Sequence, residues 1–140
     1  MNDNLERFKI KQRVFHEEAL KELRNGRKET HWMWFIFPQI LGLGHSFMAE
    51  YYSVKSVVEA IDYVNDSYLM NNYLELCHVL LELKTDDPME VFGDIDAMKL
   101  KSSLTLFYII SEDEIIKQVL DKYFNGELDV KTLKLTNIIK

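Results

Sequence analysis

Residues 31–46 read HWMWFIFPQILGLGHS, and this stretch decides the fold because most of its side chains are apolar or aromatic. Its large side chains recur at helical spacing on two adjacent faces, which is typical of a helix that other elements surround. Pro38 disfavours a helical backbone at Phe37, so the helix must be short and an irregular, glycine-containing turn follows it. We therefore predict a short buried central helix around residues 31–40.

The rest of the chain also carries the three- and four-residue apolar spacing of helices. Helices are predicted within residues 5–24, 57–64, 68–83, 88–93, 96–110, 115–124 and 129–133. The sequence SSLTLFYII, residues 102–110, is rich enough in β-branched and aromatic residues to form a buried strand instead, although we favour a helix. No hairpin pattern and no internal repeat appears in the sequence. We predict an all-α fold, with a single compact multihelical domain spanning residues 1–140.

Four polar residues are candidates for starting these helices, and Ser53 is an alternative to Ser56 for the helix at residues 57–64. Ser56 and Ser111 each have a glutamate three residues later, which is the spacing of a capping box. Asp87 precedes a proline that suits the first position of a helix, and Asp129 precedes the last short segment. We expect each of these side chains to cap the helix that follows it.

Composition and charge restrict the classes of function. The chain has 17 Lys and Arg against 23 Asp and Glu, a net charge of −6, which disfavours binding to the phosphate backbone of a nucleic acid. No stretch approaches the roughly 20 apolar residues of a membrane span, and MNDNLERFKIKQ lacks the pattern of an export signal. We expect a soluble, cytoplasmic protein. Its 17 aromatic residues would also be enough to cover the face of a homodimer.

Polar side chains interrupt the apolar stretch at His31, Gln39, His45 and Ser46. One interpretation is structural, because an unpaired buried backbone group costs about 1–3 kcal/mol and these side chains can pair with such groups. The other is that they converge with Trp34 on a small-ligand pocket beside the glycine-containing turn. An indole there would suit a nucleobase or a nicotinamide ring. Both interpretations stay open.

A second group of polar residues comes just before the apolar sequence LFYII: Lys99, Lys101, Ser102, Ser103 and Thr105. Serine and threonine are mediocre helix formers, so three of them within four positions need a reason beyond propensity. Close packing of helices through small side chains is one reason. The other is an anion site, in which a lysine supplies charge and the hydroxyls supply donors. These residues would then line the mouth of a pocket formed with residues 31–46.

Three strings in the chain are similar to one bacterial family. GRKETHWMWFIFPQILGLGHS at residues 26–46, KLKSSLTLF at 99–107 and DKYFNGELDVKTL at 121–133 resemble the family called domain of unknown function 1810. The resemblance extends from Leu5 to Leu133 and implies a multihelical single domain with a short buried central helix. It implies no established activity. The chain departs from the family pattern at His45 and Lys101, where arginine is common, and the first departure weakens a catalytic role for His45.

Three functional hypotheses stay open. In the first, the protein binds or acts on a small anionic metabolite or nucleotide between the HWMWFIFPQ and KLKSS segments, with His31 as the candidate acid or base of any reaction. This requires Lys99 and Gln39 to face a common hollow. The second is a non-enzymatic interaction module with an exposed apolar groove at residues 47–52. In the third, the aromatic segment only organises the core. The sequence does not decide whether the protein is an enzyme, and it identifies no cofactor.

The remaining reactive side chains are expected to be structural. Cys77 lies in a helical apolar stripe and has no second cysteine to pair with, so we expect it to be buried and inert. His16 is expected on an exposed helix face, and His78 on a helix without a chemical role. The histidines lack metal-site spacing, and we expect no metal. The phosphate-binding glycine motifs are also missing, so Gly42 and Gly44 do not indicate a phosphate cradle.

Overall fold

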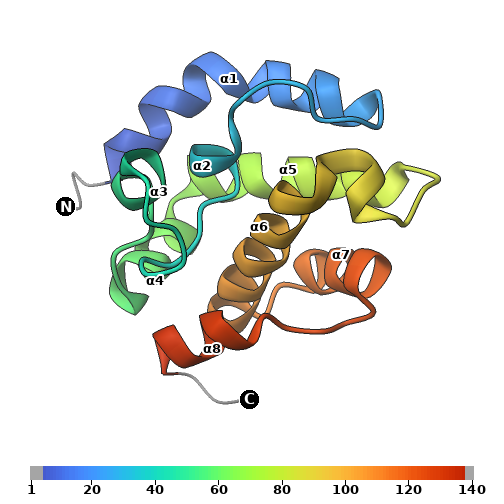
Figure 1. The fold of residues 1–140 in the computed structure, drawn as a ribbon. Coiled ribbons are helices and arrows are strands. Elements are labelled where there is room, and N and C mark those ends of the chain that lie inside the picture. The colour runs from blue at the N-terminus through green and yellow to red at the C-terminus, as the bar shows by residue number, and fades with distance from the viewer. Residues whose placement is uncertain (1–4, 138–140) are drawn as a thin grey trace.

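Helix α6, Pro88–Ser111, runs through the middle of the molecule in the computed structural model (Figure 1). The structure describes residues 5–137, so the outermost parts of the predicted domain, 1–4 and 138–140, lie outside the described residues. The other helices of the described part are α1 Glu6–Arg24, α2 Met33–Ile36, α3 Phe47–Tyr51, α4 Val57–Asn65, α5 Ser67–Glu82, α7 Glu114–Phe124 and α8 Val130–Thr136. Between residues 5 and 137 the only β-type pairing is a parallel bridge of Ile40 with Val54. The predicted all-α, single-domain fold is confirmed.

Helix α2 is the short buried central helix that the sequence predicted. It covers Met33–Ile36 and stops before Pro38, because the backbone at Phe37 is no longer helical (φ −124°, ψ 71°). The aromatic rings on either side of α2 fill the core, where Phe37 makes edge-to-face contacts with Tyr73 of α5 and Phe92 of α6. This segment therefore packs α2 against α5 and α6, which come much later in the sequence.

Side-chain caps start most of the helices. Ser56 Oγ accepts a hydrogen bond from Glu59 N at 3.1 Å, and Asp87 and Asp129 cap α6 and α8, as predicted. The predicted cap at Ser111 is wrong, because α6 continues through this residue and its hydroxyl bonds back to the helix at Phe107 O. Asp113 caps α7 instead.

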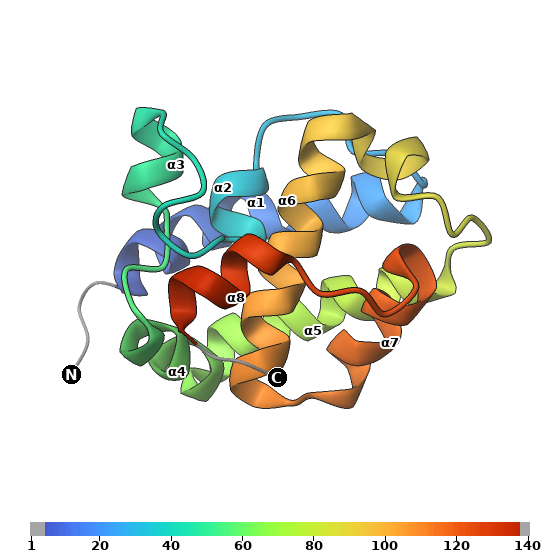
Figure 2. The ribbon, with the colours of Figure 1, turned by 60° about the horizontal axis from the view of Figure 1, so that its bottom comes forward.

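A kink at Gly93 divides α6 into two helical parts. Gly93 has φ 78° and ψ 173°, a backbone conformation outside the helical range. The short part before it matches the predicted short helix, and the long part after it includes residues 102–110, which are helical and not a strand. Figure 2 shows this long part passing beneath α8 and beside α2. No helix within residues 5–137 combines the length and the apolar character needed to cross a membrane.

Candidate functional site

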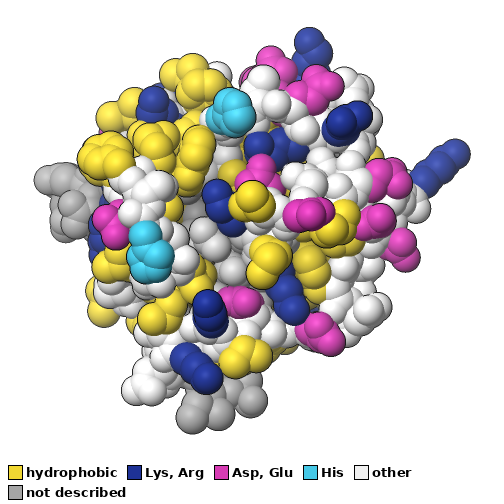
Figure 3. Space-filling view, viewed as in Figure 1, with side chains coloured by type: hydrophobic (Ala, Val, Ile, Leu, Met, Phe, Trp, Pro, Cys, Tyr) yellow, Lys and Arg dark blue, Asp and Glu magenta, His cyan; other side chains and the backbone are white. Residues whose placement is uncertain are grey.

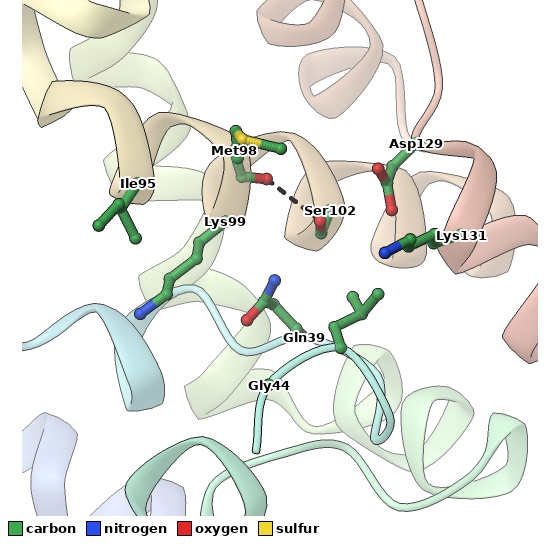
Figure 4. A pocket seen from close by; sticks show the side chains of 9 residues that line it. Gln39, Gly44, Ile95, Met98, Lys99, Ser102, Asp129 and Lys131 are labelled. Carbon is green, nitrogen blue, oxygen red and sulfur yellow. Dashed lines mark hydrogen bonds between the residues drawn. The ribbon is translucent and has the colours of Figure 1, made fainter. Parts of the chain in front are cut away.

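A cavity of about 240 Å³ lies between three segments of the chain (Figure 4). The loop after α2 contributes Gln39, Leu43 and Gly44, helix α6 contributes Ile95, Met98, Lys99 and Ser102, and the start of α8 contributes Asp129 and Lys131. A concave site with apolar walls and a few polar groups is the usual form of a small-ligand site. This cavity is therefore the candidate site.

The loop wall is anchored by backbone pairing. The Gln39 carbonyl accepts a hydrogen bond from Val54 N at 2.8 Å, and Leu41 N donates to Val54 O at 2.9 Å. Gly42 has a φ of 112°, and a Cβ there would lie 3.1 Å from the Leu135 side chain, so glycine lets the loop approach α8 closely. The Gln39 side chain points toward α6 (Figure 4), and no other residue of the described chain hydrogen-bonds to it. Its amide is therefore available to a ligand.

The α6 wall is a single stripe of the helix. Ile95, Met98, Lys99 and Ser102 follow the spacing i, i+3, i+4 and i+7, which places them on one face. Ser102 Oγ donates to Met98 O at 3.1 Å, so its proton is already used within the helix. Lys99 is thus the polar group of this wall that can still bind an anion.

The charge of Lys99 is only weakly compensated. Its Nζ lies 3.9 Å from Asp96 Oδ1, while Asp96 Oδ2 forms a shorter ion pair of 2.9 Å with Lys28 Nζ. Lys99 also lies over the Trp34 ring, 5.5 Å from its centre. Two lysines thus share one carboxylate, which leaves net positive charge at the cavity.

The α8 wall adds a second cation. Asp129 is held by its own helix, since its carboxylate accepts hydrogen bonds from Thr132 N at 3.0 Å and from Thr132 Oγ1 at 2.6 Å. Its backbone N–H donates to Thr105 Oγ1 on α6 at 2.9 Å, which fixes α8 against α6. Lys131 is exposed, and no carboxylate of residues 5–137 lies within 4 Å of its Nζ. The cavity therefore has a lysine on each side.

Of the residues predicted for a site, three line this cavity together. They are Gln39, Lys99 and Ser102, from the two segments that the sequence analysis paired. Trp34 is half-buried and contacts Lys99, but it does not line the cavity. The common hollow that the first hypothesis required for Lys99 and Gln39 is thus present in the structure.

The other residues of the KLKSS segment have structural partners. Ser103 Oγ and Tyr73 Oη share a hydrogen bond of 2.9 Å in the core, where burial raises the pKa of the tyrosine well above its usual value. Thr105 Oγ1 donates to Lys101 O at 2.8 Å, and the Lys101 ammonium pairs with Glu127 at 3.3 Å. These three residues do not line the cavity.

The remaining predicted residues of the aromatic segment also lie elsewhere. His31 is exposed on the loop before α2, and His45 is exposed on the loop before α3. Ser46 Oγ caps α3 by accepting a hydrogen bond from Ala49 N at 3.1 Å. None of the three belongs to the lining of the cavity.

His16 and Cys77 are both buried. The burial of Cys77 was predicted, whereas that of His16 was not. The predicted exposure of His16 is wrong, because α5 packs on α1 and brings Glu75 within 2.7 Å of its Nε2. His16 Nδ1 has no hydrogen-bond partner in the described chain. Cys77 is fully buried, and this burial raises the pKa of its thiol. Within residues 5–137, no three His, Cys, Asp or Glu side chains come together as metal ligands.

Part of the aromatic segment is held by a buried carboxylate, which we call the Glu22 anchor: Glu22 and the loop residues 29–32. Glu22 accepts hydrogen bonds from Glu29 N at 2.7 Å, Thr30 N at 3.0 Å, Thr30 Oγ1 at 2.5 Å and Trp32 Nε1 at 2.9 Å. Burial alone would raise the pKa of Glu22, but the bonds from Thr30, Glu29 and Trp32 lower it to about 2. Residues 29–32, in the first half of the family-like string at 26–46, therefore have a structural role.

Residues that sequence reasoning missed complete the cavity. Ile95 and Met98 could have been predicted from the sequence, since their spacing places them on the same helix face as Lys99 and Ser102. Leu43 belongs to a turn that the sequence did mark as irregular. Asp129 and Lys131 had no such signal, because only the packing of α8 on α6 brings them to the cavity.

A separate apolar patch covers α3. Phe47 is 76% exposed and Tyr51 47% exposed, and their rings stack with centres 5.7 Å apart. Met48 is half-buried and Tyr52 is buried, so the predicted surface at residues 47–52 is only partly uncovered. Figure 3 shows apolar side chains gathered over α3 and the adjoining part of α1, at the upper left.

Comparisons with known proteins identify the family. The chain is similar to the conserved hypothetical protein Rv1873 from Mycobacterium tuberculosis, whose crystal structure aligns with a TM-score of 0.93 and 35% identity, covering 97% of this chain and 98% of that one. Among proteins with curated functions, none matches the chain. The family described as protein of unknown function (DUF1810) matches residues 2–136. The chain therefore belongs to this family.

Proposed function

We propose that the protein binds a small organic anion in the cavity between the 39–44 loop, α6 and α8. The observation that carries this proposal is the pairing of Lys99 and Lys131 at one cavity, with the Gln39 amide between them. Lys99 shares Asp96 with another lysine, and Lys131 has no carboxylate within 4 Å among residues 5–137. The cavity lining carries two lysines against one carboxylate, that of Asp129, and this net positive charge suits an anion in a protein whose net charge is −6.

The size of the cavity favours a metabolite over a nucleotide. Pockets that enclose drug-sized ligands measure about 300–1,000 Å³. The cavity, at about 240 Å³, falls below that range. It would hold a phosphate or carboxylate with a few attached heavy atoms, whereas a nucleotide would project into solvent.

The proposal concerns binding and not a reaction. His31, the candidate acid or base, is exposed on the loop before α2 and does not belong to the cavity lining. Lys99 and Lys131 supply charge, and Gln39 supplies an amide that can donate or accept. These groups recognise an anion without further chemistry.

A nuclear magnetic resonance titration tests the proposal. We would add inorganic phosphate, ribose 5-phosphate and adenosine monophosphate to ¹⁵N-labelled protein and follow the amide signals. With inorganic phosphate and with ribose 5-phosphate, the signals of Leu43, Gly44 and residues 98–102 should shift more than the other amide signals. Lys99→Met should abolish these shifts, because methionine keeps most of the length of the unbranched side chain but removes the charge.

A matched control is available on α7. Lys117 is an exposed lysine paired with Asp121 at 2.9 Å, and it does not line the cavity. Lys117→Met changes the net charge by the same amount as Lys99→Met, and it should leave the shifts unchanged. If both variants weaken binding equally, the anion senses only the overall charge and the proposed site is wrong.

The α3 patch supports a second candidate function, a protein-interaction module. Phe47 and Tyr51 stack on each other in solvent, which is an unfavourable place for two large rings. The simplest partner is a second copy of the chain. Sedimentation velocity should then reveal a dimer that Phe47→Ser with Tyr51→Ser dissociates, and a monomer at all concentrations would contradict this candidate.

A further inference from the structure

We infer that the anion bound in this cavity carries an apolar group, which lies along Ile95 and Met98 of α6. The inference rests on the proposed function and adds the chemical class of the ligand. It separates an alkyl or acyl phosphate or carboxylate from a sugar phosphate of the same size and charge.

The first reason is the exposure of the α6 stripe. Ile95 is 72% and Met98 71% exposed, although both are large apolar side chains on one face of a long helix. The opposite face of the same turns is buried through Ala97 and Leu100. A helix normally turns one apolar stripe to the core and a polar stripe to solvent. Here the outward face carries two large apolar side chains as well, Ile95 and Met98.

The second reason is that α8 covers only one half of this face. Asp129 N donates to Thr105 Oγ1, which brings α8 onto the part of α6 that follows the cavity. Ser102 is accordingly buried, while Met98 and Ile95, one and two turns earlier, are not covered. The uncovered apolar half therefore begins at the cavity itself.

The third reason is the position of the cation. Lys99 follows Ile95 by four residues, so these two side chains are neighbours on the helix surface, and Met98 lines the same cavity (Figure 4). A ligand whose anionic head pairs with Lys99 can extend its other end over Ile95 and Met98. A hydroxylated ligand would place polar groups against these side chains and lose hydrogen bonds with water.

Calorimetric titration of the whole protein with a matched set of phosphates tests the inference. Inorganic phosphate measures the head alone, and ethyl, butyl and hexyl phosphate add apolar carbons. Glucose 6-phosphate has six carbons, as has hexyl phosphate, but carries hydroxyls. Each fully buried methylene is worth about a fourfold gain in affinity. We expect affinity to rise along the alkyl series, and hexyl phosphate to bind at least about tenfold more tightly than glucose 6-phosphate.

Two variants locate the apolar contact. Met98→Gln keeps the approximate shape of an exposed side chain, so the fold should tolerate it. It should flatten the dependence on chain length, and so lower the affinity for hexyl phosphate far more than the affinity for inorganic phosphate. Phe47→Gln removes an equally exposed apolar side chain on α3 and should change neither quantity. If Phe47→Gln flattens the series instead, the alkyl chain binds to α3 and the inference is wrong.

The remaining outcomes separate this inference from the proposed function. Binding of all phosphates with equal affinity would overturn the apolar group and keep the anion site. Absence of binding for every phosphate, inorganic phosphate included, would overturn the anion site itself. Dimerisation of the unliganded protein that Met98→Gln abolishes would show that a second copy covers Ile95 and Met98, which also overturns the inference.

Discussion

The carboxylate of the Glu22 anchor is fully paired, whereas the lysine of the α6 stripe is only weakly paired. In the anchor, one carboxylate accepts four hydrogen bonds and the Lys28 ammonium binds both Thr30 O and Asp96. In the stripe, Lys99 has one long ion pair and its apolar neighbours are exposed. Both regions lie partly within the strings that resemble the family, the anchor through residues 29–32 and the stripe through Lys99 and Ser102. The contrast shows that one part of a family-like sequence can hold the core together while another part forms an open surface.

The two regions are also connected. Asp96 pairs with Lys28 at 2.9 Å and approaches Lys99 at 3.9 Å, so the anchor loop and the cavity wall share one carboxylate. The Lys28 Nζ lies 5.0 Å from the centre of the Trp32 ring, and that indole donates to Glu22. The architecture of the anchor thus helps to hold Lys99 at the cavity without neutralising it.

Removing the indole of the anchor should have the largest effect on stability. Trp32 is fully buried and its Nε1 is one of the donors to Glu22. Trp32→Ala should lower the free energy of unfolding by about 3–5 kcal/mol, because it leaves a cavity and removes a hydrogen bond from a buried carboxylate. Urea denaturation measures this loss. A loss below 1 kcal/mol would mean that the anchor does not hold the core together.

The second largest loss of stability should come from acid, which weakens the Glu22 anchor. The pKa of Glu22 is about 2 in the folded protein against an ordinary 4.5. A lowered pKa contributes stability that is complete above the unfolded value and is lost as the pH falls. The contribution of Glu22 should therefore be complete above pH 4.5 and disappear between pH 4.5 and about 2, an overall loss of about 3 kcal/mol.

The variant Glu22→Gln isolates this contribution from the other carboxylates. It should be less stable than the natural protein at pH 7, and the difference between the two free energies of unfolding should shrink as the pH approaches 2. A difference that stays constant over this range would contradict the lowered pKa of Glu22.

Within the KLKSS segment, two adjacent serines differ in the same way: one has a buried partner in the core and the other faces the cavity. Ser103 shares a buried hydrogen bond with Tyr73, whereas Ser102 borders the cavity and bonds only to its own helix. Ser103→Ala should cost about 1–3 kcal/mol because it leaves a buried phenol without a partner. Adding Tyr73→Phe should recover part of this loss, and thermal denaturation of the two variants measures both steps. No recovery in the double variant would show that the hydroxyl pair is not the cause.

The sequence was sufficient for most of the helices and for their order, because helical spacing, prolines and caps are local properties. It did not predict α3, which is only five residues long. Pro38 alone was enough to predict the end of α2. Ser111 was assigned to the wrong helix since two acceptors, Ser111 and Asp113, compete within three residues and spacing does not rank them. The burial of His16 depends on which face of α1 receives α5, which is a tertiary property.

The candidate site was predictable only in part, for the same reason. Gln39 and Lys99 were paired because both strings combine polar groups with apolar surroundings, and the fold places them at one cavity. Ser103 and Thr105 looked equivalent to Ser102 in sequence, but one helical turn contains inward and outward positions. Lys131 is 32 residues away from Lys99 in the chain. Its contribution follows from the docking of α8 and from no local pattern.

Of the substitutions considered, Lys99→Met should have the smallest effect on stability. This small effect would separate a role of Lys99 in binding from a role in folding. Lys99 is partly exposed, its ion pair is long, and methionine can keep the contact with Trp34. Lys99→Met should therefore change the free energy of unfolding by less than about 1 kcal/mol, as measured by urea denaturation. If it destabilised the protein as strongly as Trp32→Ala, Lys99 would be part of the architecture. A stable variant that no longer binds phosphate would show instead that the charge is kept at the cavity for a ligand.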